Sequence, residues 1–324
     1  MFNIRHAGIK GFGIFASRRI PRGSRILAER ALISINDTKN NILAAVAELR
    51  PADQKTLLGL SLNETRRSSP MNLLSAAWQC FPSHMREIPR SRDILNIFYN
   101  NNFALTDGPG TRAVFPSVAR INHSCVPNSQ GNFNANLGSF TVHATRDIAL
   151  GEEVTISYLR HELGLRAARQ GSLHEGYGFH CACELCSGSV QRRRDSNDRR
   201  RDTGARLKTF AEARHPSGDN KTLRLQLELT RLVIDVHEQE GLAGRELASL
   251  YTAAAGMAAR LDDLRLANTL GARGLKLEKD AVGTDSPFYE ATLLAFSRMS
   301  FEDDMTKFTP TDDTGLELSY APWT

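Results

Sequence analysis

The six residues CACELC, at positions 181–186, are the feature that most limits how this chain can fold. Three thiols this close together are poorly placed for disulfides among themselves, but they are well spaced to wrap around a tetrahedral zinc ion. The fourth ligand can be the adjacent His180 or the distant Cys125. A ligand directly beside Cys181 would crowd the loop, so we favour Cys125. The predicted ligands are therefore Cys125, Cys181, Cys183 and Cys186. Inert buried thiols are the alternative, which three cysteines in six residues disfavour.

Composition sets the broad class of the protein. The 324 residues suffice for two units with separate cores, and the hydrophobic and charged fractions, 41% and 24%, are ordinary for a globular protein. No apolar run is long enough to span a membrane, and the first residues lack a secretory signal, so we expect a soluble protein in the nucleus or cytoplasm. We further expect it to be a monomer. Five cysteines, an odd number, argue against a disulfide framework.

Much of the net charge of +5 lies in QRRRDSNDRRR, residues 191–201. We interpret this run as a solvated loop, with a nuclear localisation signal or a nucleic-acid contact as open alternatives.

Two segments with β-like patterns flank a segment with helical spacing. Short apolar runs broken by Gly and Pro predict strands between Gly8 and Ile35, and helical spacing follows over 37–97. Alternation at Phe140, Val142 and Ala144, then a run from Val154 to Tyr158, predicts further strands. We therefore expect a β unit that brackets a helical insertion. The isolated Cys80 is predicted to be a core residue.

Beyond the basic run, helical periodicity continues to about residue 302. One predicted helix carries its apolar face at Leu225, Leu229, Leu232, Val233 and Val236. An antiparallel pair is predicted on either side of Asp262 and Asp263, and a further helix should open with Ser286 as N-cap and Pro287 at the first position. This pattern suits helix hairpins of tetratricopeptide type, although it contains about one repeat-like pair.

Two further motifs are weak when taken singly. KGFG (10–13) has two glycines, which permit a close backbone approach to a ligand or simply a tight turn, and it lacks the third glycine of a dinucleotide fingerprint. GEEVTISY (151–158) ends a strand in a tyrosine, which alone is best explained as a buried ring with a hydrogen-bonded hydroxyl.

Taken together and in this order, five motifs resemble the SET-domain lysine methyltransferases. They are KGFGIFASRRIPRGSRILAE, NNF (101–103), FPSVARINHSCVPNS, GEEVTISYL and YGFHCACELC (177–186). The resemblance is greatest to the SET and MYND branch, whose SET domain is split, and it covers residues 1 to about 187. The helical C-terminal third resembles the helix-repeat domain of that branch much less specifically.

The resemblance implies an α+β fold, a β-rich SET core that binds S-adenosylmethionine in one cleft and admits a lysine side chain from the opposite face. It implies one structural zinc per chain and a protein or peptide substrate, histone or non-histone. Tyr158 would be the catalytic tyrosine and Tyr177 a wall of the lysine channel. The implied cofactor contacts are Lys10, Gly11, Gly13, Asn101, Asn122, His123, Tyr158 and Phe179, with Phe179 stacked on the adenine.

The chain departs from that branch in one respect, because residues 33–98 contain Cys80 alone and lack the cysteines of a MYND module. We expect the SET domain to occupy residues 1–36 and 98–160, on either side of an insertion over 37–97. A post-SET zinc segment (161–187), a basic linker (188–204), a helical domain (205–308) and a flexible tail (309–324) should follow. Two rival functions stay open: an inactive SET scaffold that binds proteins through its helical domain, and a zinc-stabilised nucleic-acid-binding protein.

Overall fold

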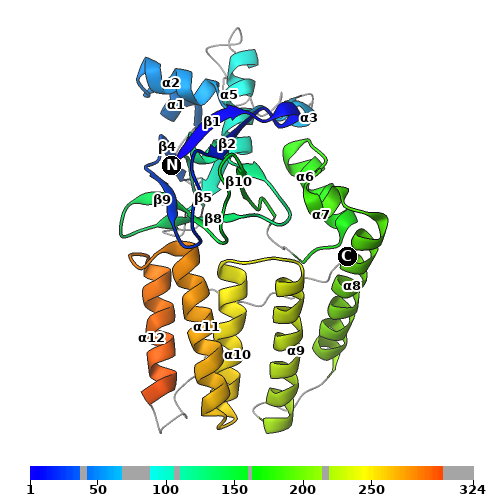
Figure 1. Cartoon of the computed structure of the whole chain (residues 1–324). Helices are drawn as coiled ribbons and strands as arrows, with labels where there is room; N and C mark the ends of the chain where they lie inside the picture. Colours follow the sequence, from blue (N-terminus) through cyan, green and yellow to red (C-terminus); the bar gives the residue numbers. More distant parts are fainter. Residues whose placement is uncertain (37–41, 68–87, 106–109, 160–162, 214–218, 302–324) are drawn as a thin grey trace.

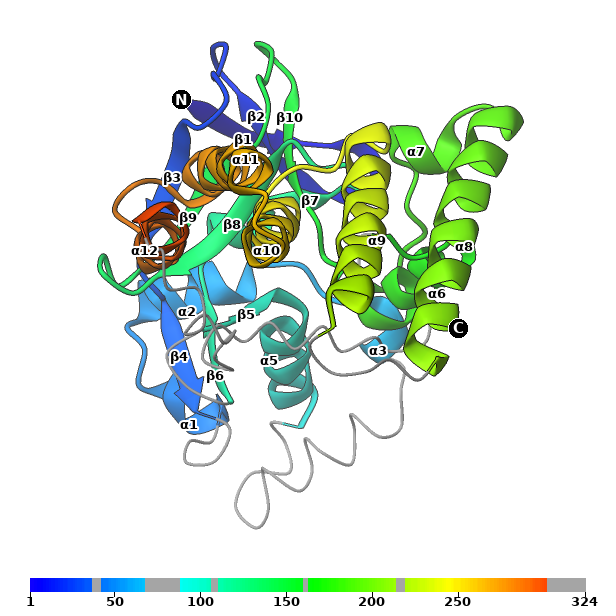
Figure 2. The same cartoon turned by 90° about the horizontal axis from the view of Figure 1, so that it is seen from below.

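The computed structural model describes residues 1–36, 42–67, 88–105, 110–159, 163–213 and 219–301. Three small β-sheets form a β-rich unit, and a row of long helices stands beneath it in Figure 1. Further helices lie at the top and along one side of the sheets in Figure 1, and those along the side appear at the right of the view from below in Figure 2. The predicted α+β class, with a β-rich core and a helical C-terminal region, is confirmed.

The strands belong to three sheets that draw on distant parts of the chain. The first sheet has the order β1 (Phe2–His6), β2 (Phe12–Ala16), β10 (Glu153–Ile156) and β7 (Asn122–His123). The second has the order β3 (Arg25–Glu29), β9 (Ser139–Ala144) and β8 (Ser129–Asn134). The third has the order β4 (Ile33–Asn36), β6 (Thr111–Val114) and β5 (Asn102–Ala104). A 3-10 turn, η1 (Gly8–Lys10), joins β1 to β2, and another, η3 (Val118–Arg120), lies between β6 and β7.

The core between these sheets explains why the apolar runs form strands. The alternation predicted at 140–144 is strand β9, yet all six residues of β9 are buried. Both faces are covered because Phe140, Val142 and Ala144 pack into the core between the sheets and helix α11 packs against the strand. The largest fully buried side chains of this core are Ile14, Ile20, Phe115, Ile121 and Ile148.

A second core belongs to the helical insertion. Its described helices are α1 (Ile42–Ala47), α2 (Pro51–Leu58), α3 (Glu64–Arg67) and α5 (Ile88–Asn101). Leu57 and Phe98 are fully buried there against Ile35 of β4. Cys80, predicted to be a core residue, lies outside the described residues.

The second half of the chain is helical. Its elements are α6 (Arg166–Tyr177), α7 (Glu184–Ser187), α8 (Val190–Glu212), α9 (Asn220–Gln239), α10 (Arg245–Arg260), α11 (Leu264–Val282) and α12 (Pro287–Phe301). The break between α10 and α11 falls where the two aspartates predict it: Asp262 has a positive φ of 61°, and Asp263 Oδ1 accepts a hydrogen bond from the Leu266 N–H. Ser286 caps α12, since its hydroxyl accepts from the Phe288 N–H. The predicted apolar face of α9 is wrong at one position, because Leu225 is 38% exposed whereas Leu223 and Leu227 are buried; Val236 is buried as predicted.

The prediction of a basic linker over 188–204 is also wrong, because residues 190–212 form one continuous helix, α8. Ser189 caps this helix by accepting a hydrogen bond from the Arg192 N–H. Two arginines of the run are held by a carboxylate from the end of α9: Arg199 and Arg200 both bind Glu240. Glu240, 40 positions beyond Arg200, therefore neutralises positive charge that the sequence pattern predicts to be exposed to solvent.

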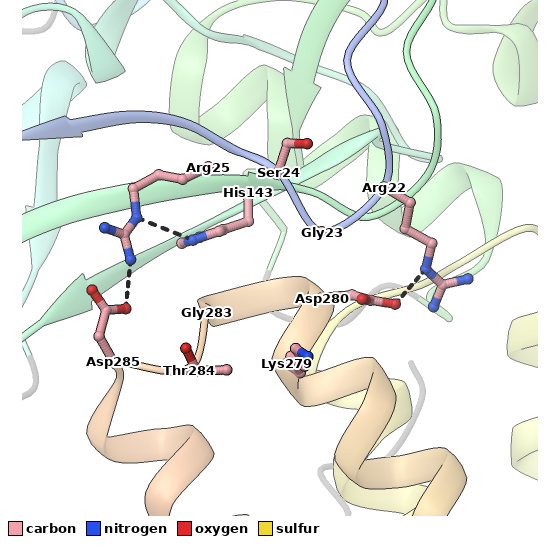
Figure 3. A pocket seen from close by; sticks show the side chains of 10 residues that line it. All are labelled: Arg22, Gly23, Ser24, Arg25, His143, Lys279, Asp280, Gly283, Thr284 and Asp285. Atoms are coloured by element: carbon pink, nitrogen blue, oxygen red, sulfur yellow. Dashed lines mark hydrogen bonds and ion pairs between the residues drawn. The ribbon is translucent and has the colours of Figure 1, made fainter.

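The long helices are joined to the β unit by charged contacts around a cavity of about 510 Å³ (Figure 3). On one side Arg22 pairs with Asp280 at 2.6 Å, and on the other Arg25 pairs with Asp285 at 2.5 Å. The buried His143 accepts a hydrogen bond from Arg25 Nε. Among the helices in the described part of the chain, none is long and apolar enough to cross a membrane. The predicted flexible tail, 309–324, lies outside the described residues.

Candidate functional site

The four predicted metal ligands come together from two separate loops. Cys125 follows strand β7, Cys181 and Cys183 lie in the turn that joins α6 to α7, and Cys186 lies in α7. Their four sulfur atoms all lie within 4.8 Å of one another. Cys125 Sγ is 3.9 Å from Cys181 Sγ and 3.6 Å from Cys186 Sγ. His180, the alternative fourth ligand, is exposed and stacks on His174 instead.

The spacing of these thiols fits a tetrahedral zinc ion. Zinc–sulfur bonds of about 2.3 Å place tetrahedral sulfurs about 3.8 Å apart, whereas a disulfide would need about 2.05 Å. The observed separations of 3.6 and 3.9 Å bracket the first value. Hydrogen bonds from the Cys125 thiol lower the pKa of Cys183 and Cys186, which favours for these two the thiolate form that binds metal, whereas the pKa values of Cys125 and Cys181 are raised. Four such ligands would leave no open position, so a zinc here would be structural.

The Gly-x-Gly turn packs against Asn122 and an acidic residue of β10. Gly11 has a φ of 77°, which other residues rarely adopt. Gly13 is required by space, because a Cβ there would lie 2.8 Å from both Asn122 Nδ2 and Glu153 Oε1. Lys10 Nζ binds Glu153 Oε2 at 2.6 Å. The predicted residues Lys10, Gly13 and Asn122 are thus brought together around Glu153.

These contacts fix the orientation of the Asn122 amide. Its Nδ2 group donates to Glu153 Oε1 at 2.8 Å and to the Phe12 carbonyl at 3.2 Å. Both amide hydrogens are used, so the side-chain oxygen is the group that Asn122 can offer to a ligand, as a hydrogen-bond acceptor. The ring of Phe12 is 51% exposed beside this turn.

Tyr158 lies among three other rings just beyond β10. Its ring centroid is 4.8 Å from that of Tyr177, 5.4 Å from His123 and 6.4 Å from Phe179. The hydroxyl donates a hydrogen bond of 2.6 Å to the Ile121 carbonyl. Desolvation, then the nearby Tyr177 and Glu153, raises the pKa of Tyr158 above its usual range. At neutral pH Tyr158 is therefore a protonated phenol, whose oxygen keeps acceptor capacity.

His123 connects the aromatic group to the cysteines. Its Nδ1 accepts a hydrogen bond of 3.0 Å from the Tyr158 N–H, and its Nε2 lies 3.4 Å from Cys125 Sγ. Burial lowers the pKa of His123 to about 4, so the imidazole is neutral. Both ring nitrogens have protein partners, so His123 links Cys125 to the backbone of Tyr158 and fixes their relative positions.

Asn101 lies apart from the other predicted cofactor residues. It is 5% exposed at the end of α5. Its amide donates to the carbonyls of Ser61 and Ile97, each at 2.8 Å. These bonds tie the helical insertion together, and among the contacts of the described residues none joins Asn101 to Asn122 or Tyr158. A cofactor contact by Asn101 stays a prediction.

Two groups of the site were missed by the sequence analysis. Glu153 belongs to the motif GEEVTISY, and its place beside a Gly-x-Gly turn 143 positions away has no signal in the sequence pattern. The carbonyl of Ile121 is a backbone group, so its role as the acceptor for Tyr158 has no residue-type signal at all.

Comparison with known proteins shows what the first half of the chain resembles. Residues 11–159 match the family model of the SET domain, so this segment is similar to SET domains. The resemblance predicted from the five motifs is thereby confirmed.

Its relatives include proteins of the SET5 and SMYD types. Histone-lysine N-methyltransferase set5 of Schizosaccharomyces pombe is 30% identical over 59% of this chain and 52% of its own. Histone-lysine N-methyltransferase ASHR1 of Arabidopsis thaliana is 33% identical over 50% of this chain and 32% of its own. N-lysine methyltransferase SMYD2 of Gallus gallus is 31% identical over 51% of this chain and 36% of its own. The chain thus spans about half or less of the length of these relatives.

A solved SET domain, that of LSMT bound to lysine and AdoHcy, aligns with 97% of this chain and 93% of its own. Its sequence identity is 15% and its TM-score 0.36, so it carries no argument about this site.

Proposed function

We propose that this protein is an S-adenosylmethionine-dependent protein-lysine N-methyltransferase. The observation that carries the proposal is the place of Tyr158, which lies inside a group of rings with its hydroxyl anchored to the Ile121 carbonyl. The SET domain over residues 11–159 and the names of the SET5 and SMYD relatives support it. The substrate is a protein lysine, in a histone or another protein.

When bound, S-adenosylmethionine supplies a methyl group on a positively charged sulfur. In the proposed complex the turn of Gly11 and Gly13 brings backbone close to the cofactor, and Asn122 offers its side-chain oxygen to an N–H group. The fixed amide of Asn122 supports this assignment, because its two hydrogens are already donated to Phe12 and Glu153. Phe179 is proposed to stack on the adenine, and Lys10, Asn101 and His123 are the further proposed contacts.

The aromatic group is proposed to prepare the lysine amine. A free lysine has a pKa of about 10.4, so its deprotonation at pH 7 costs about 4.6 kcal/mol. A dry channel walled by Tyr177 lowers that cost, because desolvation disfavours the ammonium, and an adjacent sulfonium acts in the same direction. The Tyr158 oxygen accepts an N–H of the amine and aligns its lone pair with the methyl carbon, a restriction that can contribute about 7 to 11 kcal/mol to lowering the barrier. Tyr158 is thus an orienting residue rather than a base.

The test uses the purified chain, a radiolabelled methyl donor, and either histones or a whole-cell extract. We expect the label to enter protein and to be recovered as methyl-lysine after the protein is hydrolysed. Calorimetry with S-adenosylhomocysteine separates the alternatives. Cofactor binding without transfer to any protein would favour the inactive scaffold, and absence of both would reject the proposal.

A further inference from the structure

A buried guanidinium lies against the four cysteines and has no role in the proposed reaction. Arg169 projects from α6 and is 3% exposed. Its Nη1 donates to the Gly164 carbonyl, and its Nη2 lies 4.0 Å from Cys186 Sγ. Among the ion pairs of the described residues none includes Arg169, and its Nε is buried without a hydrogen-bond partner in that region of the chain.

Charge balance explains why an arginine occupies this place. Zinc with four thiolates carries a net charge of about −2, and a buried uncompensated charge is costly. The arginine side chain cannot lose its proton in a protein, so Arg169 contributes a permanent positive charge beside Cys186. The reverse also holds, because four neutral thiols would leave Arg169 as a buried cation with no described carboxylate to compensate it.

The network continues from Arg169 to the C-terminal helices. Arg200 of α8, which is 4% exposed, donates to the same Gly164 carbonyl at 3.2 Å. Its Nη2 binds Glu240, which ends α9, at 2.9 Å. Glu240 also accepts from Ser196 at 2.6 Å. Figures 1 and 2 both show α6, α7, α8 and α9 on one side of the molecule. The hydrogen bonds through the Gly164 carbonyl and Arg200 therefore connect Arg169 to Glu240 without a break.

We propose that Arg169 is a positioning residue of the four-cysteine metal site, and that Gly164, Arg200 and Glu240 link this site to helices α8 and α9. Glu240 balances Arg200, while the metal-bound thiolates balance Arg169. Metal occupancy therefore stabilises the docking of α9, and the docked helices in turn hold a cation beside the thiolates. The inference concerns metal binding and helix packing, so it can succeed or fail independently of methyl transfer.

The first experiment measures zinc affinity by competition with a chromogenic chelator on the full chain. Arg169→Gln removes the charge but can still donate to the Gly164 carbonyl, and we expect it to weaken zinc binding by about 10- to 100-fold, as for other outer partners of metal ligands. Arg169→Lys keeps the charge and should retain more affinity. Arg192→Gln is the matched control, because Arg192 is an exposed arginine paired with Glu184 of the same cysteine turn. It should bind zinc as the wild type does.

A spectroscopic measurement separates this role from a merely structural one. In the Co²⁺-substituted protein, loss of the neighbouring cation in Arg169→Gln should move the thiolate-to-metal charge-transfer band to lower energy, whereas Arg169→Lys should leave the band in place. Unchanged zinc affinity in Arg169→Gln, or an equal loss in the Arg192 control, overturns the proposal. If the glutamine variant does not fold, the lysine variant decides: an unmoved band supports the proposal and a moved band overturns it.

The second experiment tests the link to α9 by hydrogen exchange on the wild-type chain, zinc-loaded and chelated. We expect chelation to speed exchange in the last two turns of α9, residues 233–240, and to leave α12 unchanged, because α12 does not belong to the network. Equal exchange in α9 with and without zinc overturns the link, as would an equal acceleration in α12.

Discussion

Replacing Tyr158 by phenylalanine tests the proposed reaction most directly. The substitution keeps the ring contacts with Tyr177, His123 and Phe179 and removes the 2.6 Å hydrogen bond to the Ile121 carbonyl. A lost hydrogen bond of this kind costs about 1 kcal/mol of stability, whereas domains unfold with about 5 to 15 kcal/mol. Tyr158→Phe should therefore fold, and it should bind S-adenosylhomocysteine with nearly the wild-type affinity.

Methyl transfer should fall much further than stability. Without the hydroxyl, the amine loses the acceptor that aligns it, and misplacement of a reacting group by about 1 Å can cost about 100-fold in rate. Such a loss corresponds to about 2.7 kcal/mol of activation free energy. The assay is single-turnover transfer from labelled cofactor to the best substrate of the extract screen. Tyr99→Phe is the matched control, because Tyr99 is 47% exposed on α5.

The pH profile distinguishes an orienting phenol from a base. Burial, with Tyr177 and Glu153, raises the pKa of Tyr158, so the hydroxyl stays protonated at neutral and mildly alkaline pH. Transfer should rise with pH as the lysine loses its proton, and the profiles of the wild type and Tyr158→Phe should be parallel. A rising limb present in the wild type and absent from the variant would contradict the orienting role. Wild-type rates in Tyr158→Phe would remove the tyrosine from the mechanism altogether.

Three other substitutions probe the site and its surroundings. Cys183→Ala should bring bound zinc, measured by atomic emission, below the one equivalent expected for the wild type, and a full equivalent would contradict the ligand assignment. Gly13→Ala should abolish S-adenosylhomocysteine binding in calorimetry, since its Cβ would lie 2.8 Å from Asn122 Nδ2, while Gly171→Ala, in helix α6 and with no atom within 4 Å of its Cβ, should bind normally. Glu240→Gln should lower the free energy of unfolding by about 3 kcal/mol, because the buried Arg200 would lose the carboxylate that balances its charge, with exposed Glu238→Gln as control. Burial raises the pKa of Glu240, but the hydrogen bond from Ser196 and the charge of Arg200 outweigh burial and hold this pKa below its usual value. The loss of stability in Glu240→Gln should therefore be fully present above about pH 4.3 and should shrink as the pH falls below that value.

Much of the local structure could be predicted because local rules decide it. The aspartate pair at 262–263 and the Ser286-Pro287 pair mark helix ends through caps and positive φ, which depend on a few adjacent residues. The strand at 139–144 was predicted from alternation alone. Its complete burial could not be, because that depends on α11, which packs across it from more than 100 positions further along the chain.

The failures lie where a distant partner changes the meaning of a local pattern. Leu225 has helical spacing with its apolar neighbours, yet it is exposed because α9 packs through Leu223 and Leu227. The basic run became part of α8 because Glu240, 40 positions away, binds two of its arginines. Rules based on charge blocks assume that water is the partner of each charge, and here the partner is a buried carboxylate.

The register of one short parallel ladder accounts for the rest of the site. Strands β7 and β10 pair through Asn122 with Thr155 and His123 with Ile156. Both strands run in the same direction, so the residues that follow them leave at the same edge: Cys125 two residues after His123, and Tyr158 two residues after Ile156. If the pairing of β7 with β10 slipped by one residue, Tyr158 would move away from the His123 ring, and the side chains of the shifted strand would point to the opposite face of the sheet. The order of motifs in the sequence could not reveal this, because only the pairing brings the metal ligand, the bracing histidine and the tyrosine to a single edge.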